Sequence, residues 1–246
     1  MVATVLVFSG LDPGGGAGLS ADIEAVAAMG AHALPVATAL TVQDNERVYE
    51  VAAVDAGLLT RQADALAARF TIGAVKIGIP GNRRNAGAIA ALVARLRAEN
   101  PELPVVLDPV LASGHGDALG QGDALAAIAV LLDVATLVVP NLMEAQALGP
   151  VPCPHVLLTG GHGEGDVVVN RWLHDGVQRS WHWPRLPGQF HGSGCTLAAA
   201  IAARLAQGDA MLDALERGQV FCHQALAQSF AIAPGQRIPR RFLQSP

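Results

Sequence analysis

Short apolar runs that favour strands alternate with helical patterns along most of the chain, and this order constrains the fold more than any other feature. The runs expected to be strands are residues 2–8, 33–40, 73–79, 105–107, 136–139 and 155–159. Helical patterns cover 19–29, 58–70, 86–98, 124–132, 197–206 and 211–230. Such alternation is typical of a parallel sheet with helices on both faces. The sequence therefore predicts an α/β fold, a three-layer α/β/α sandwich around a mostly parallel central sheet.

The chain has 246 residues, of which 51% are hydrophobic, and it is long enough to bury a sizeable core. Neither a linker nor an internal repeat interrupts it, so we expect one domain over residues 1–236 and a C-terminal tail over 237–246. The segment 145–154 is short for a crossover helix. Pro152 and Pro154 also disfavour a helix and predict a break within this segment.

Two runs of alternating polarity, residues 167–173 and 178–183, are joined by Asp175-Gly176. This pattern predicts a β-hairpin near 167–183, because Asp-Gly favours the tight turn that such hairpins use. Trp181 and Trp183 fall on the same face of the second run, which is more typical of a core than of a ligand site.

A glycine-rich turn over residues 190–196, Phe-His-Gly-Ser-Gly-Cys-Thr, leads into an apolar helical segment. Gly192 and Gly194 allow the backbone to approach a ligand. The first N–H groups of the helix lack internal partners and favour an anion. Cys195 stands on that first turn, where the helix dipole can lower a thiol pKa and make a nucleophile or base. The same residues are equally compatible with a tight turn around a buried, inert Cys195.

A second glycine loop follows the first strand, from Asp12 to Gly18. It is neither a Walker loop, because the chain has no Gly-Lys pair, nor a dinucleotide fingerprint in the correct register. It is either a flexible connection or a backbone surface for a small molecule. Asp22 stands near the start of the next helix, where it either stabilises the helix end or faces the ligand. Lys76, on the third expected strand, is the only lysine.

Acidic and amide side chains recur where expected strands end: Gln43, Asp108, Asn141 and Glu144. Taken singly, each is more often a helix cap or a turn residue. The carboxyl ends of parallel strands meet in one crevice, where ligands bind in open α/β sheets. Their common position therefore predicts a shared polar site.

Composition argues against several function classes. The formal net charge of −5 and an aromatic content of 4% favour neither nucleic-acid binding nor base stacking. Three scattered cysteines favour neither a disulfide framework nor a zinc site, and the eight histidines show no metal-like pairing. We see no leader and no apolar run approaching the ~18 residues of a membrane span. We therefore expect no membrane partner and a cytoplasmic location.

Several motifs occur together, in order, over about nine-tenths of the chain. They are Ser9-Gly10-Leu11-Asp12, Gly15 to Gly18, Ala21-Asp22, Thr38 to Gln43, Lys76-Ile77-Gly78, Val106 to Val110, Pro140-Asn141 with Glu144-Ala145, Gly160-Gly161-His162 and His191 to Leu197. In these the chain resembles the hydroxymethylpyrimidine and phosphomethylpyrimidine kinases of thiamin biosynthesis, members of the ribokinase-like superfamily. Singly each motif is weak, but together they are highly specific.

The resemblance implies an α/β/α kinase that passes the γ-phosphoryl group of Mg-ATP to the hydroxymethylpyrimidine, to its monophosphate, or to both. It implies ATP and Mg²⁺ as cofactors and a homodimer. Asp22 and Gln43 match positions that bind the pyrimidine ring, and Gly10 lies beside it. Asp108 and Glu144 match the metal site.

By the same resemblance, Asn141, Thr159 and Gly161 match positions around the nucleotide phosphates. Cys195 matches the general base, in front of the row of N–H groups supplied by Gly192, Ser193 and Gly194. Backbone donors of this kind stabilise charge that develops during phosphoryl transfer.

The chain departs from the family pattern at three places. Thr159 stands where the family usually has lysine, and a hydroxyl donates a hydrogen bond to phosphate without neutralising it. The crossover before Thr159 is shorter than usual, and Asp44 replaces the usual asparagine. These departures keep two rivals open: a pyridoxal kinase, and a pyrimidine-binding member of the fold that catalyses nothing. A cysteine hydrolase is a poorer fit, because spacing suggests no His–Asp pair for Cys195.

Overall fold

A computed structural model describes residues 1–111, 124–161 and 163–242. Within this part of the chain, nine strands form one sheet in the order β3-β2-β1-β4-β5-β6-β7-β8-β9. The strands are β1 (Thr4–Leu11), β2 (His32–Gln43), β3 (Val48–Ala53), β4 (Ala74–Ile77), β5 (Val105–Leu107), β6 (Leu137–Val138), β7 (His155–Leu158), β8 (Val167–His174) and β9 (Val177–Pro184).

Strands β1, β2, β4, β5, β6 and β7 are parallel to their neighbours in this group, as the sequence predicts. Strand β3 pairs antiparallel with β2, and β8 pairs antiparallel with both β7 and β9. Strand β9 therefore runs in the same direction as β7. The carboxyl ends of β1, β2, β4 to β7 and β9 consequently share one edge of the sheet.

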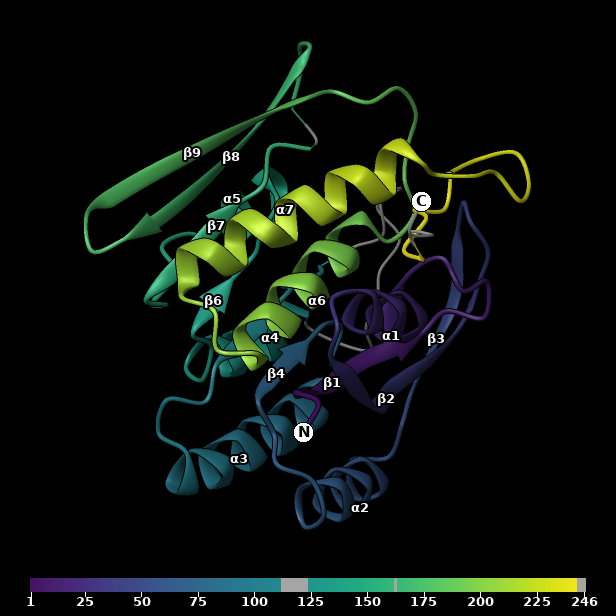
Figure 1. Ribbon diagram of the computed structural model, residues 1–246. Helices are drawn as coiled ribbons and strands as arrows, with labels where there is room; N and C mark the ends of the chain where they lie inside the picture. The colour runs from purple at the N-terminus through teal and green to yellow at the C-terminus, as the bar shows by residue number, and fades with distance from the viewer. Residues whose placement is uncertain (112–123, 162, 243–246) are drawn as a thin grey trace.

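Helices cover both faces of the sheet, which confirms the three-layer sandwich (Figure 1). The helices are α1 (Gly18–Ala28), α2 (Ala56–Ala67), α3 (Arg83–Glu99), α4 (Ala124–Leu132), α5 (Leu142–Leu148), α6 (Ser193–Ala206) and α7 (Met211–Ala227). Helices α1, α6 and α7 contribute to one hydrophobic core and α2, α3 and α4 to the other.

Strand β1 shows why the sheet strands read as continuous apolar runs. Val5 and Val7 point into the core beneath α1 and α6, whereas Leu6 and Phe8 point into the core on the opposite face. All four side chains are fully buried. A strand covered on both faces has no solvent side, so polar residues do not alternate with the apolar ones.

The predicted hairpin is present as β8 and β9, and its free end projects from the body of the molecule (Figure 1). Asp175 and Gly176 both have positive φ, 47° and 77°, as a two-residue hairpin turn requires. Trp181 and Trp183 pack on the core that α6 and α7 share, so their expected role in packing is confirmed.

Two elements differ from expectation. Strand β3 was not predicted, because it lies at the sheet edge, where each of its residues is exposed or half-buried, and its sequence gives only a weak apolar signal. Helix α5 forms where the sequence predicts too little room for a helix after residue 145. It fits because it begins earlier, at Leu142, and ends after seven residues at Leu148.

The sequence predicts a tail from residue 237 onward, but the segment to Phe242 packs on the body. Phe230 pairs with Ile238, and Phe190 pairs with Arg237, through isolated bridges. The Arg241 residue is only 1% exposed. The predicted polar glycine loop over residues 113–117 lies outside the described residues. In the described part of the chain, the structure has no helix both long enough and apolar enough to cross a membrane.

Candidate active site at the carboxyl edge of the sheet

The glycine turn before α6 is shaped by Gly192, the N-cap residue, which has a φ of 76°. A Cβ at this position would lie 2.2 Å from the carbonyl oxygen of Gly16, so a larger residue would clash with the loop after β1. The Gly192 carbonyl accepts hydrogen bonds from the Thr196 backbone N–H and hydroxyl, at 2.9 and 2.7 Å. Glycine is therefore required here by both φ and space.

The N–H groups of Ser193, Gly194 and Cys195 have no acceptor among the residues that the structure describes. They belong to the first turn of a fourteen-residue helix, where the helix dipole adds positive potential. Gly194 is exposed, so this row of donors is open to a ligand. The geometry suits the binding of an anion, as a phosphate is.

Asp12 ties the two glycine loops together. Its carboxylate accepts hydrogen bonds from the N–H groups of Gly14, Gly16 and Ala17, at 2.7, 2.9 and 2.8 Å. The same carboxylate lies 2.9 Å from Nε2 of His191, the residue before Gly192. Burial opposes ionisation, but His191 and the backbone donors prevail and lower the pKa of Asp12.

The sequence analysis assigned no role to Asp12 or to His191. In the structure, His191 joins the loop after β1 to the turn before α6. A usable signal was present for Asp12. An aspartate that precedes Pro-Gly-Gly is typical of a turn in which the carboxylate accepts backbone N–H groups.

Lys76 of β4 and Asp22 of α1 form a fully buried ion pair. Both carboxylate oxygens of Asp22 lie 2.8 Å from Lys76 Nζ. Burial alone would lower the pKa of Lys76, but the charges of Asp22, Cys195 and Asp108 raise it above its usual value. The ammonium therefore stays charged. Asp22, a predicted ring-binding residue, is committed to this pair and is 0% exposed.

Lys76 was noted as the single lysine and as part of a family motif, but it was assigned no role, although its position in the sequence carried a signal. An ionisable side chain inside an uninterrupted apolar strand must be paired once it is buried.

Asp108 and Cys195 meet beside this pair. Asp108 follows β5 and is 4% exposed, and its Oδ1 and Oδ2 lie 3.7 and 3.8 Å from the position of a Cβ on Gly194. Within the described chain Oδ2 has no hydrogen-bond partner although it is buried. Burial raises the pKa of Asp108, against the opposing charge of Lys76.

The Cys195 thiol differs from the expectation of a lowered pKa. Burial raises the pKa of Cys195 to about 12. Lys76 opposes this rise, whereas the charges of Asp108 and Asp22 reinforce it. Desolvation and two carboxylates thus outweigh the helix end, and the thiol is protonated while no ligand alters its surroundings.

Asn141 and Glu144 form a reciprocal capping box at the start of α5. The Asn141 side chain accepts from Glu144 N–H, and the Glu144 carboxylate accepts from Asn141 N–H, both at 2.9 Å. Asn141 and Glu144 therefore cap the start of α5, the structural role that such residues usually have. Burial and the charge of Asp108 raise the pKa of Glu144 to about 8.

Asp108 and Glu144 are suited to a divalent cation. The two carboxylates repel each other when both are charged, and the charge of Asp108 helps to raise the pKa of Glu144. Asp108 Oδ2 is buried without a partner among the described residues. Carboxylate oxygens are the ligands that Mg²⁺ prefers. In the described ranges no group of three or more His, Cys, Asp or Glu side chains could hold a metal ion. A cation here would therefore need oxygens from water or from a ligand as well.

The other end of the edge is formed by Thr159 and the turn that follows β7. Thr159 N–H and its hydroxyl both donate to the Pro140 carbonyl, at 2.9 and 3.3 Å, which places Thr159 beside Asn141. Gly161 has open space on its Cα, since no described atom lies within 4 Å of a Cβ built there. These three predicted nucleotide residues are thus neighbours.

Gly10 and Gln43 lie at the ends of β1 and β2. A Cβ on Gly10 would lie 2.4 Å from Ile79 Cδ1, so this backbone is kept close to its neighbour. Gln43 is half-buried, and its side chain has no hydrogen-bond partner in the described part of the chain. The structure therefore brings Asp22, Asp108 and Cys195 together, whereas Gln43 stands apart from them at the end of β2.

Comparison with known proteins identifies the family of the chain. The family profile described as phosphomethylpyrimidine kinase matches residues 12–152 and 147–239. The hydroxymethylpyrimidine/phosphomethylpyrimidine kinase of Rhizobium meliloti is 34% identical over 96% of this chain and 95% of that relative. The kinases of the same name from Mycobacterium tuberculosis and Escherichia coli are 35% and 31% identical, over 94% and 95% of this chain and 90% and 94% of those relatives.

Solved structures share the fold. A pyridoxal kinase from Staphylococcus aureus, in complex with AMP-PCP and pyridoxal, superposes with a TM-score of 0.83 at 22% identity, over 98% of this chain and 94% of that one. A phosphomethylpyrimidine kinase from Clostridium difficile gives a TM-score of 0.75 at 24% identity, over 92% and 99%. At these identities the structures support the fold, and the sequence matches decide the family. The chain belongs to the phosphomethylpyrimidine kinase family.

Proposed function

We propose that the chain transfers the γ-phosphoryl group of ATP to the hydroxymethyl group of 4-amino-5-hydroxymethyl-2-methylpyrimidine, and then to the monophosphate so formed. The observation that carries this proposal is the row of N–H groups from Ser193 to Cys195, unpaired within the described chain, which faces Asp108 at the carboxyl edge of the sheet. A member of this family needs an anion site of this kind for phosphoryl transfer.

The N–H groups at the start of α6 bind the phosphoryl group as it moves. Charge builds on its equatorial oxygens during transfer, and fixed backbone donors stabilise that charge without rearranging. One well-aimed donor of this kind contributes roughly 3–4 kcal/mol in comparable oxyanion sites. Gly194 keeps the approach open, because it places no side chain between the donors and Asp108.

Cys195 accepts the proton of the attacking hydroxyl. The hydroxyl oxygen forms a bond to the γ-phosphorus, the bond from that phosphorus to the bridging oxygen breaks, and ADP leaves with the bond's electron pair. The proton passes to the Cys195 sulfur, which must be a thiolate at that moment. Positive charge placed at Asp108 lowers the pKa of the thiol, because the Asp108 carboxylate is one of the charges that raise it.

Asp108 and Glu144 are the residues that would hold Mg²⁺, together with phosphate oxygens and water. Bound there, Mg²⁺ supplies positive charge to the phosphates. Lys76 has a different role, because it neutralises Asp22 in the core and keeps one positive charge beside Asp108 and Cys195.

The two substrates approach from opposite ends of the edge. Asn141, Thr159 and Gly161 surround the nucleotide phosphates, with the Thr159 hydroxyl in place of a charged group. Gly10 and Gln43 lie at the pyrimidine end, where Gly10 lets Ile79 pack closely against the end of β1 and the Gln43 amide is available to bind the ring. Asp22 supports this end by fixing Lys76.

We infer a cytoplasmic homodimer, since ATP is consumed there and the described cysteines are all free thiols. The β2–β3 hairpin would form the contact, because it exposes Leu40, Val42 and Tyr49 by 51%, 54% and 65%. Exposed apolar groups clustered on an edge hairpin mark interaction surfaces. Light scattering tests this: a mass near that of the 25.3 kDa monomer would refute the dimer.

The experiment for the activity is an incubation of the protein with Mg-ATP and either the hydroxymethylpyrimidine or pyridoxal, with products followed by mass spectrometry and phosphorus NMR. We expect the pyrimidine monophosphate, then the diphosphate, and much slower phosphorylation of pyridoxal. Faster turnover of pyridoxal would reassign the substrate. A protein that binds the pyrimidine but turns over no ATP, with Mg²⁺ present, would be a binder and not a kinase.

A further inference from the structure

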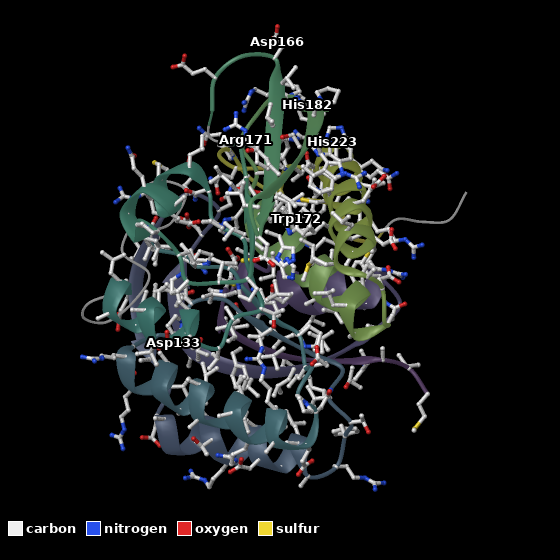
Figure 2. The ribbon with its side chains drawn as sticks, turned by 90° about the vertical axis from the view of Figure 1, so that its left-hand side faces the viewer. Asp133, Asp166, Arg171, Trp172, His182 and His223 are labelled. Atoms are coloured by element: carbon white, nitrogen blue, oxygen red, sulfur yellow. The ribbon has the colours of Figure 1, made fainter. Side chains whose placement is uncertain are left out.

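Arg185 lies where β9 ends, on the same edge of the sheet as Thr159. Its side chain reaches into the turn that follows β7: Nε donates to the Gly165 carbonyl at 2.6 Å, and Nη1 donates to the Gly161 carbonyl at 2.7 Å. The Arg185 N–H also donates to the Asp166 carbonyl at 2.8 Å. Figure 2 shows Asp166 at the end of the hairpin where β8 begins. Arg185 thus stabilises the turn after β7 by donating hydrogen bonds to its backbone carbonyls.

The remaining guanidinium nitrogen, Nη2, is buried and has no hydrogen-bond partner among the described residues. It lies 3.9 Å from the position of a Cβ on Gly163, and Leu142 Cδ1 lies at the same distance from that point. Leu142 is the first residue of α5, directly after Asn141. Nη2 is therefore directed to the space between the turn and the helix start that Asn141 caps.

An unpartnered guanidinium nitrogen is costly when buried, unless a ligand completes its hydrogen bonding. No ion pair of the described chain uses Arg185. Thr159, the residue expected beside the phosphates at this end of the sheet, is neutral and donates to the Pro140 carbonyl. Lys76 is already paired with Asp22. Arg185 is thus a cation with a free donor beside Thr159, an expected phosphate-binding residue that carries no charge.

We propose that Arg185 binds the phosphate chain of the nucleotide through Nη2, while Nε and Nη1 hold the turn after β7. The inference rests on the proposed kinase function and names a residue for it that no sequence motif indicated. A planar guanidinium has donors in a fixed fork, so it can hold the turn and bind phosphate at once. The charge that Thr159 does not supply then comes from the end of β9.

The test is a binding series with adenosine, AMP, ADP and ATP, measured by titration calorimetry in EDTA so that no metal contributes. In the wild type we expect affinity to rise with the number of phosphates. In Arg185→Gln, the affinity for ADP and ATP should fall roughly ten- to hundredfold, the range of a lost charged hydrogen bond, while adenosine binding changes less than about twofold.

The matched control is Arg171→Gln, which removes the same charge from β8 of the same hairpin, where Arg171 is exposed (Figure 2). This variant should bind adenosine, AMP, ADP and ATP with the same affinities as the wild type. Arg185→Lys keeps a positive charge but cannot hold both carbonyls, so ADP and ATP should still bind more tightly than adenosine, by less than in the wild type.

Equal loss of adenosine and ATP affinity in Arg185→Gln would overturn the proposal and leave Arg185 as a support of the turn. An unchanged series would overturn it as well. If Arg185→Gln does not fold, Arg185→Lys decides: the proposal is lost if its ADP and ATP affinities match the wild type. A wild type that binds no ATP even when Mg²⁺ replaces the EDTA would instead refute the proposed kinase function.

Discussion

The buried cation Lys76 contributes to the charge balance around Cys195 and opposes the rise in the pKa of its thiol. Lys76 is surrounded by the carboxylates of Asp22 and Asp108 and by the thiol. With Glu144 nearby, acidic groups outnumber basic ones at this edge of the sheet. Burial raises the pKa of Cys195 and of Glu144, and nearby carboxylates reinforce the rise, so the binding of a cation here would be coupled to the release of protons.

The raised pKa of Glu144 should make the free energy of unfolding depend on pH. Its pKa is about 8 in the folded protein and 4.5 for an ordinary glutamate, so the folded state binds more protons between these values. The free energy of unfolding should therefore fall as pH rises from about 4.5 to 8, with a contribution from Glu144 that approaches about 1.4 kcal/mol per pH unit.

Urea titrations of the wild type and Glu144→Gln at several pH values check this prediction. Glutamine keeps an oxygen for the Asn141 N–H, so the cap is preserved while the titration is lost. The variant should show a shallower slope, whereas the exposed control Glu102→Gln should keep that of the wild type. Parallel slopes in all three proteins would contradict a raised pKa for Glu144.

For single residues, the sequence predicts where a side chain lies in the fold better than it predicts the burial and the charges around that side chain. Asp108 and Cys195 were expected in one site because strand ends and a glycine turn converge there, and the structure places them together. The ionisation state of Cys195 was not predictable, because it depends on burial and on charges from three other elements. Arg185 and His191 were missed for a related reason: their partners lie on distant segments.

The C-terminal segment acts as a structural element of the site and not as a tail. Arg241 donates through Nε to the Thr196 hydroxyl at 2.8 Å and through Nη1 to Glu24 at 3.1 Å. Nη2 donates to the carbonyls of Gly16 and His191. One buried side chain thus joins α1, α6 and both glycine loops.

Replacing Arg241 with glutamine should loosen this junction. Several buried acceptors would lose their donor, so the free energy of unfolding should fall by about 2–4 kcal/mol. Arg240→Gln is the matched control, because Arg240 is exposed and its guanidinium lies over the Phe230 ring. Urea denaturation that finds the two variants equally stable would show that the segment contributes no more than a surface contact.

Helices and strands with a clear pattern of apolar residues were predictable from the sequence, whereas β3, α5 and the C-terminal segment were not. The buried parallel strands and the hairpin turn at Asp175-Gly176 carry clear local patterns. Strand β3 is half-exposed at an edge, and α5 owes its start to the Asn141–Glu144 cap more than to an apolar stripe. The C-terminal segment is ordered by Arg241, whose partners are more than forty positions away in the sequence.

In the molecule as a whole, the proposed catalytic turn lies between the two proposed binding regions. Helix α6 packs over β4 and β5 in the middle of the sheet, with β7 and β9 on one side and β1 and β2 on the other (Figure 1). The fold class followed from the order of elements, and the family followed from the motifs. What the sequence could not supply is the linkage that Asp12, His191 and Arg241 make between distant segments.

The measurement that tests the account most directly is the rate of pyrimidine phosphorylation by the wild type and by Cys195→Ala, at saturating Mg-ATP. If Cys195 is the base, kcat should fall by about 10²–10⁴-fold, while KM for ATP and for the pyrimidine should stay within about threefold. The variant should fold normally, because alanine fits wherever the thiol did. A variant with the wild-type kcat would contradict the assignment of Cys195 as the base.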